Sequence, residues 1–175
     1  MQIKLVAIVA LATGCLADLY TVNSIKKINQ ATIEYHKSLT DWTGDYAGGV
    51  VMLKKSRDLI NSIKAAGTHP EAKIHRRGTP EEDEKLEQEG FDVAHSLVGE
   101  IRSAVDTAIA TKPKIEAVPV VGKRISLYTF EKFRSAASDL GGVFSPKASP
   151  ERLEEAQDIV KRIDDEFARG YVALK

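Results

Sequence analysis

Residues 149–171 read SPERLEEAQDIVKRIDDEFARGY, and this stretch decides the fold class. Its apolar side chains recur every three or four residues, which places them on one face of a helix. Ser149 and Pro150 supply an N-cap and a first-turn proline. The acidic run at residues 164–166 is expected to lie on the solvated face. The stretch therefore predicts a long amphipathic helix, with an apolar stripe of Leu153, Ala156, Val160, Ile163, Phe167 and Tyr171.

Four further segments share this helical periodicity, and no segment shows sustained alternation of apolar and polar residues. In the first segment the apolar or semi-apolar stripe consists of Val22, Ile25, Ile28, Thr32, Tyr35, Leu39 and Trp42. The four segments cover residues 18–42, 50–66, 80–112 and 119–140. Together with the last helix they predict an all-α fold, an antiparallel bundle of about five long amphipathic helices. We expect a single domain over residues 18–175.

Proline and glycine mark the expected ends of these helices. Thr79 is an N-cap, Pro80 takes the first helical position and Glu82 completes a capping box. Glycines and prolines elsewhere are expected to interrupt the helices, because they break helical periodicity or favour turns. The expected interruptions are residues 43–49, 112–114 and 141–142.

The first 17 residues differ from the rest of the chain. Lys4 provides a short basic start, residues 5–12 carry no charge, and small residues stand at Cys15 and Ala17. This arrangement is typical of a secretory signal peptide. The apolar run is shorter than the roughly 20 residues that span a bilayer. We expect cleavage after Ala17 and secretion; an N-terminal anchor helix, or a bacterial lipoprotein motif that acylates Cys15, are the alternatives.

Charge and cysteine content exclude several classes of function. The chain has 25 Lys and Arg against 25 Asp and Glu, whereas nucleic-acid binding requires a concentrated cationic surface. Cleavage after Ala17 would leave 158 residues without cysteine and with a formal charge of −1. A secreted chain of this kind depends on its hydrophobic core for stability. We therefore expect no nucleic-acid partner and no disulfide.

Catalytic and metal-binding motifs are missing from the sequence. The four histidines form no H-E-x-x-H pattern, and no G-x-S-x-G elbow occurs. We expect no enzymatic activity, no metal and no cofactor. Arg76 and Arg77 form either a dibasic processing site or part of a solvated loop. The C-terminus carries no hydrophobic tail for a lipid anchor, so we also expect no transmembrane anchor.

Several short motifs stand in a characteristic order along the chain. After the expected signal peptide come Asp18-Leu19, WTGDYAGG at residues 42–49, LVGEI at 97–101, IATKPK at 109–114 and IDDEF at 163–167. Their order and spacing resemble those of the fungal hydrophobic surface-binding protein A family, which includes the cell-wall galactomannoprotein antigens. The resemblance spans essentially the whole mature chain.

This resemblance implies a secreted, extracellular or cell-wall-associated helical bundle without enzymatic activity. It implies adsorption to hydrophobic surfaces and the recruitment of secreted hydrolases there. For some members it implies a fatty acid held inside the bundle. The chain departs from the galactomannoproteins in lacking N-glycosylation sequons and a Ser/Thr-rich anchored tail.

Two functional hypotheses follow, and simple core packing of the apolar stripes is the alternative to the first. In the first, the bundle carries a fatty acid or another apolar ligand between its helices. In the second, it is a surface-active adhesin whose apolar stripes open onto a hydrophobic solid, with no internal ligand. At the pocket mouth, Ser126, Tyr128 or Lys123 could bind a carboxylate head group. The candidate ligand-binding residues are Leu97, Ile101, Val105, Ile125, Tyr128, Ile159, Ile163 and Phe167.

Overall fold

A computed structural model describes residues 19–67, 79–118, 122–145 and 148–175. These ranges contain no β-strand, which confirms the predicted all-α bundle. The expected signal peptide, Arg76 and Arg77, and the expected helix start at Pro119 lie outside the described residues. The long helices are α1 (Leu19–Asp41), α2 (Tyr46–Gly67), α3 (Pro80–Ala110), α5 (Gly122–Phe144) and α6 (Leu153–Leu174), and the short elements are α4 (Lys112–Ala117) and the 3-10 helix η3 (Pro150–Arg152).

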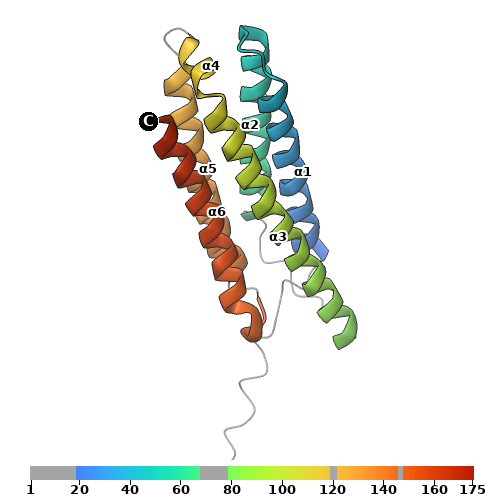
Figure 1. Cartoon of the computed structure of the whole chain (residues 1–175). Helices are drawn as coiled ribbons and strands as arrows, with labels where there is room; N and C mark the ends of the chain where they lie inside the picture. Colours follow the sequence, from blue (N-terminus) through green and yellow to red (C-terminus); the bar gives the residue numbers. More distant parts are fainter. Residues whose placement is uncertain (1–18, 68–78, 119–121, 146–147) are drawn as a thin grey trace, which may run out of the picture.

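The five long helices form a closed ring. Successive long helices alternate in direction, as the prediction of an antiparallel bundle requires (Figure 1). α1 packs against α2 and α3, α2 also packs against α5, and α6 joins α5 to α3. Each long helix thus has two principal neighbours, and the apolar stripes of all five face a common axis.

Four aromatic rings occupy the bundle core, and we call them the aromatic layer: Tyr35 on α1, Phe130 and Phe133 on α5, and Phe167 on α6. The Phe133 ring lies 5.3 Å from the Tyr35 ring and 5.1 Å from the Phe167 ring, centroid to centroid. Phe130 meets Phe133 edge-on at 5.9 Å. Such offset and edge-on pairs are favourable for aromatic quadrupoles. The layer links three helices across the core.

The corner between α1 and α2 is tighter than predicted. The interruption expected at residues 43–49 ends early, because α2 already begins at Tyr46. Asp45 caps this start: its Oδ1 accepts a hydrogen bond from the Gly48 N–H at 2.7 Å. The indole N–H of Trp42 donates to the Asp45 carbonyl oxygen at 2.7 Å. A Cβ at Gly48 would lie 2.5 Å from the Trp42 ring, so this glycine lets the Trp42 ring pack closely against the start of α2.

Two other predicted interruptions are wrong. Residues 112–114 open the short helix α4, because Pro113 stands in its first turn, where a missing N–H costs nothing. α5 continues through Gly141 and Gly142 to Phe144. A Cβ at Gly141 would lie 2.4 Å from the Val160 side chain, so Gly141 lets α5 and α6 approach each other. The start of α3 is as predicted, with a complete capping box between Thr79 and Glu82.

Glu166 corrects the expectation that the acidic run at residues 164–166 is solvated. Its side chain is buried between α3 and α6, and its carboxylate accepts hydrogen bonds from the Nε atoms of Arg102 and Arg169, both at 2.8 Å. Arg169 also pairs with Asp106 at 2.7 Å. Burial opposes ionisation, but the two arginine hydrogen bonds outweigh it and lower the pKa of Glu166. The cluster ties α6 to α3 through a buried charge.

Gly170 permits the contact between α6 and the aromatic layer, and its substitution tests that packing. A Cβ at Gly170 would lie 2.2 Å from the Phe130 ring. We expect Gly170→Ala to lower the free energy of unfolding by about 1–3 kcal/mol, because the core is already full at this point. Gly99→Ala in α3 meets no atom within 4 Å and should raise it by about 0.5–1 kcal/mol. Urea denaturation measures both, and equal effects would contradict this account.

The Glu166 cluster predicts a specific acid sensitivity. Because the folded pKa of Glu166 is lowered, its contribution is present above the unfolded pKa of about 4.3 and is lost as pH falls through the folded pKa. We expect Glu166→Gln to lower the free energy of unfolding by about 1–3 kcal/mol at neutral pH. The difference from wild type should vanish at low pH, as measured by denaturation across a pH series. Asp165→Asn, on an exposed pair with Lys161, is the matched control and should change little.

Candidate functional site

An apolar cavity lies at the end of the bundle that carries α4. We call it cavity A; its volume is about 240 Å³. The end of α1, the start of α2, α4 and the start of α5 surround it, and α3 and α6 each contribute one residue. Its apolar lining comprises Leu39, Trp42, Val50, Met52, Leu53, Ala108, Ile115, Val118, Ile125, Phe130 and Leu174.

The opening of cavity A is marked by exposed apolar side chains on the first turns of α2. Tyr46 is 80% exposed and Val50 is 49% exposed, and both line the cavity. Val51 beside them is also exposed. An apolar cavity edged by exposed apolar side chains is typical of a binding site for an apolar ligand or surface.

Charge is nearly absent from the wall of cavity A. Asp45 is the only charged residue that lines it, and no described Lys, Arg or His does so. A hydrogen bond from the Thr43 hydroxyl, aided by the Gly48 N–H, lowers the pKa of Asp45 and keeps it ionised. Two nearby lysines form hydrogen bonds with backbone carbonyl oxygens of other segments. Lys114 donates to that of Trp42 and Lys112 to that of Ala173, each at 2.8 Å.

Four hydroxyl-bearing side chains with little or partial exposure also line cavity A. Ser56 donates to the Leu53 carbonyl oxygen at 2.8 Å, and Ser126 donates to that of Gly122 at 3.0 Å. Tyr35 and Thr129 are 6% and 8% exposed, and neither hydroxyl has a hydrogen-bond partner among the described residues. Burial raises the pKa of Tyr35, so its hydroxyl keeps its proton.

A second, smaller cavity lies nearer the other end of the bundle. We call it cavity B; its volume is about 70 Å³, and it is bounded mainly by α3, α5 and α6. The aromatic layer lies between the two cavities: Tyr35 and Phe130 line cavity A, Phe167 lines cavity B, and Phe133 contacts all three rings. The core is thus divided into two compartments.

The structure distributes the eight candidate ligand-binding residues over different places. Five of them line cavity B: Leu97, Ile101, Ile159, Ile163 and Phe167. Ile125 lines cavity A, whereas Val105 is buried in the core and lines neither cavity. Tyr128 is 59% exposed, lies under the Lys132 ammonium and lines neither cavity. Of the suggested head-group partners, only Ser126 lines cavity A, and Lys123 does not.

The α1–α2 corner contributes Trp42, Asp45 and Tyr46 to cavity A, and all three belong to the motif WTGDYAGG. Helical periodicity includes Trp42 in the first apolar stripe, but it assigns Asp45 and Tyr46 to an interruption and not to a site. The available signal was its composition, since an aromatic pair flanking a helix-capping Asp is suited to a packed corner.

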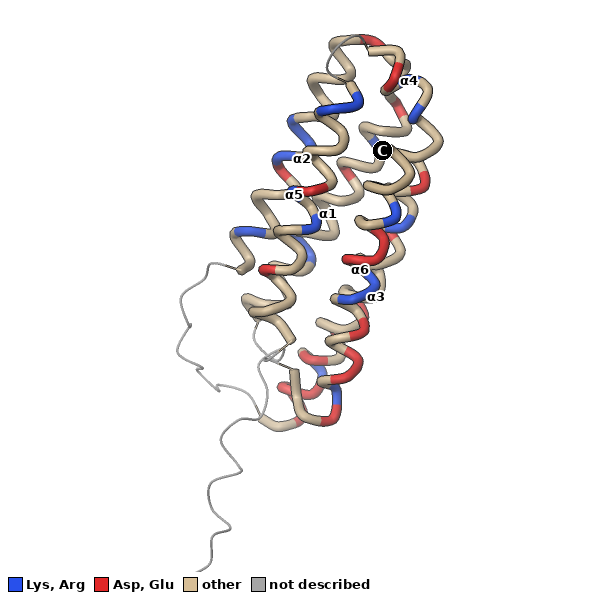
Figure 2. Tube along the Cα trace, turned by 90° about the vertical axis from the view of Figure 1, so that its left-hand side faces the viewer, with Lys and Arg blue, Asp and Glu red and all other residues tan. Residues whose placement is uncertain are grey.

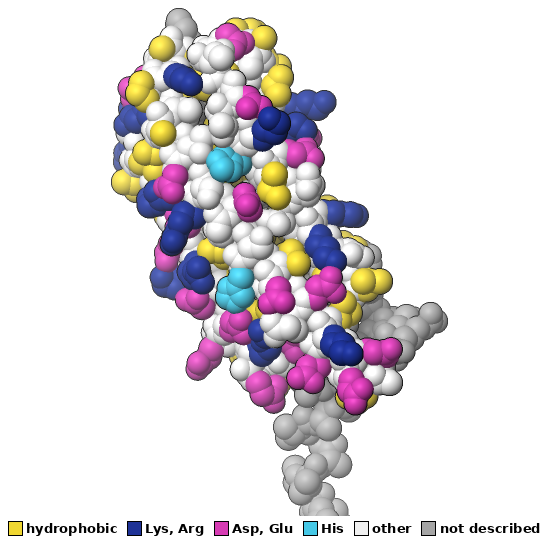
Figure 3. Space-filling model, turned by 45° about the vertical axis from the view of Figure 1, so that its right-hand side comes forward, with side chains coloured by type: hydrophobic (Ala, Val, Ile, Leu, Met, Phe, Trp, Pro, Cys, Tyr) yellow, Lys and Arg dark blue, Asp and Glu magenta, His cyan; other side chains and the backbone are white. Residues whose placement is uncertain are grey.

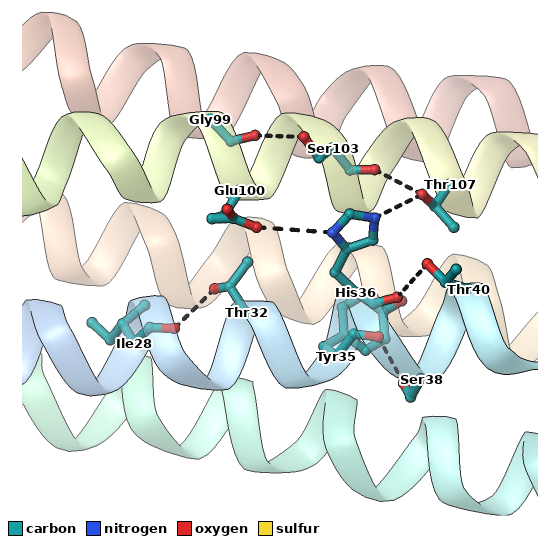
Figure 4. Close-up of polar contacts among 10 residues, drawn as sticks. All are labelled: Ile28, Thr32, Tyr35, His36, Ser38, Thr40, Gly99, Glu100, Ser103 and Thr107. Atoms are coloured by element: carbon teal, nitrogen blue, oxygen red, sulfur yellow. Dashed lines mark hydrogen bonds and ion pairs between the residues drawn. The ribbon is translucent and has the colours of Figure 1, made fainter.

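His36 joins α1 to α3 in an arrangement that outwardly resembles a hydrolase triad (Figure 4). Its Nε2 lies 2.9 Å from Thr107 Oγ1, and its Nδ1 lies 3.8 Å from a Glu100 carboxylate oxygen. The Thr107 hydroxyl, however, donates to the Ser103 carbonyl oxygen at 3.0 Å within α3. The surrounding N–H groups belong to a continuous helix and cannot form an oxyanion hole. The cluster is a polar tie between two helices.

The surface carries mixed charge. Acidic residues gather at the start of α3, and basic residues are frequent along α2 (Figure 2). The face in Figure 3 intersperses both signs with hydrophobic side chains. No group of three metal-ligating side chains occurs among the described residues. None of the described helices has the length and apolar character needed to cross a bilayer.

Comparisons with known proteins identify the fold. No family model matches the sequence, and no curated protein matches it either. Ligand-binding domain 1 of the Penicillium marneffei MP1 protein, solved with arachidonic acids, has a TM-score of 0.74 at 14% identity over 90% of this chain and 97% of that one. Domain 2 of the same protein, also solved with arachidonic acids, has a TM-score of 0.73 at 16% identity, over 90% of this chain and 94% of that one. AFMP4P, solved with palmitic acid, has a TM-score of 0.75 at 15% identity, over 89% of this chain and 97% of that one. At these identities the chain shares their fold.

Proposed function

We propose that this chain binds a fatty acid or another apolar ligand inside its helix bundle, in cavity A. The cavity itself carries the proposal: it is lined almost entirely by apolar side chains and is edged by exposed Tyr46 and Val50. Its volume is about 240 Å³. For comparison, an engineered apolar cavity of about 150 Å³ binds benzene.

The structural comparisons support this proposal. Three domains with the same fold were solved with arachidonic or palmitic acid bound. Ligand sites in helical bundles are built in the core from side chains on facing helices, and cavity A has that construction. A binding protein of this kind needs no catalytic residues, so we propose a non-enzymatic role.

Adsorption to a hydrophobic surface is the second candidate function. Exposed Tyr46, Val50 and Val51 favour it, because they bring three large apolar side chains to the surface within the first two turns of α2. The resemblance to hydrophobic surface-binding proteins points the same way, as does the expected signal peptide. Secretion, association with the cell wall and recruitment of secreted hydrolases belong to this proposal.

Filling either cavity with a larger side chain tests where the ligand binds. Ala108 lines cavity A and Ala156 lines cavity B, and both are buried. We expect Ala108→Leu to lower the affinity for palmitic acid at least tenfold, because the new side chain takes ligand space. Ala156→Leu is the matched control and should bind as wild type does, since the aromatic layer separates the cavities. Displacement of a fluorescent fatty acid measures both affinities.

Three results would contradict the proposal in different ways. Absence of any fatty acid or other apolar ligand, bound or added, in native mass spectra of the wild-type protein would exclude a carrier. Loss of binding in Ala156→Leu alone would move the site to cavity B. Depletion from solution onto polystyrene beads without any fatty-acid binding would leave the surface-binding function in its place.

A further inference from the structure

We propose that Tyr35 and Thr129 bind the polar head group of the ligand at the inner end of cavity A, and that this head group is uncharged. The chemical class is a long-chain alcohol, an ester or a protonated fatty acid. This inference rests on the proposed function and specifies how the ligand lies in the site: the head group lies beside the aromatic layer and the chain extends toward Tyr46 and Val50.

The two hydroxyls supply the first argument. A hydroxyl that faces a cavity and has no partner in the protein can form a hydrogen bond with a molecule in that cavity. The side chains of Tyr35 and Thr129 are more than nine-tenths buried and line the same cavity, and neither hydroxyl forms a hydrogen bond among the described residues. Neither hydroxyl is a fully enclosed atom, as Asn29 Oδ1 is. Ser56 and Ser126 line the same cavity but donate to carbonyl oxygens of their own helices. The hydroxyl protons of Ser56 and Ser126 are therefore already used, whereas those of Tyr35 and Thr129 can be donated to a ligand.

Their position supplies the second argument. The Tyr35 ring packs against Phe133 of the aromatic layer, and Thr129 directly precedes Phe130 of that layer. Tyr46 and Val50, which mark the opening, are instead exposed. Tyr35 and Thr129 thus belong to the buried part of the cavity A lining, beside the aromatic layer. A ligand that satisfies them enters with its head group first.

The charges supply the third argument. A carboxylate moved into a low-dielectric interior needs a cation or several strong donors. No described Lys, Arg or His lines cavity A, and its one charged residue, Asp45, is itself anionic. Lys112 and Lys114 are held on backbone carbonyl oxygens outside the lining. Two hydroxyls suit a neutral oxygen better, because each can donate or accept one hydrogen bond.

Three ligands with the same ten-carbon chain test the inference: decanol, decanoate and decane. We expect decanol to bind wild-type protein at least tenfold more tightly than decanoate at neutral pH. Tyr35→Phe and Thr129→Val should each weaken decanol binding about three- to tenfold, the effect of one lost hydrogen bond. Neither should change the affinity for decane. Displacement of a fluorescent apolar probe measures all three ligands.

Control variants keep the result interpretable. Both substitutions preserve side-chain shape and remove a hydroxyl that forms no hydrogen bond among the described residues, so the thermal unfolding temperature should stay equal or rise. Ser62→Ala, on the same helix but outside cavity A, removes a hydroxyl that is bonded to the Asp58 carbonyl oxygen and should leave decanol affinity unchanged.

The outcomes separate this inference from the proposed function. Equal affinity for decanol and decanoate, or unchanged decanol binding in Tyr35→Phe and Thr129→Val, would overturn the head-group assignment while leaving apolar-ligand binding intact. A lower unfolding temperature with unchanged decanol affinity would assign the hydroxyls to bound water and would also overturn it. Failure of all three ligands to bind would instead refute the proposed function.

Discussion

The closed ring of five helices is the constraint on which the rest of the structure depends. A ring of this size has a common axis that all five apolar stripes must fill together. Branched aliphatic side chains do not reach far enough to fill it everywhere. The aromatic layer fills the axis where Tyr35, Phe130, Phe133 and Phe167 meet, and a cavity remains on either side of it. Both cavities are thus the parts of the bundle axis that the aromatic layer leaves unfilled.

The two ends of the bundle differ in how closely their helices approach one another. At the α4 end, the Trp42–Asp45 corner and the two lysine-to-carbonyl bonds hold the helices in a fixed frame around the open space of cavity A. In the other half, Gly141 brings α5 against Val160 of α6, and cavity B is correspondingly small. Close approach of α5 and α6 reduces the volume of cavity B, whereas the hydrogen bonds at the α4 end leave more space in cavity A. These hydrogen bonds fix the positions of the chain segments that surround cavity A.

Helical periodicity predicts the long helices well, because the spacing of Val22 to Trp42 or of Leu153 to Tyr171 depends on the local chain alone. It predicts less about the site. An apolar stripe shows which face of a helix turns inward, but it does not show how far along the bundle axis each residue lies. Leu97 and Ile125 both belong to such stripes, yet Leu97 lines cavity B and Ile125 lines cavity A. The interruptions predicted at Gly48 and Gly141 are wrong for the same reason. These glycines allow close contacts with Trp42 and Val160, which the local sequence does not reveal. Glu166 likewise gains its role from Arg102 on another helix.

The polar groups of the core fall into two kinds, and the difference bears on function. Glu166 is buried with its arginine partners in place, so its charge stabilises the packing of α3 against α6 whether or not a ligand is present. The hydroxyls of Tyr35 and Thr129 have no such partners among the described residues, and both side chains line cavity A. An apolar side chain at either position would fill the same space. A hydroxyl there adds a hydrogen bond when a molecule in cavity A supplies the partner, and this is the role that we propose for both.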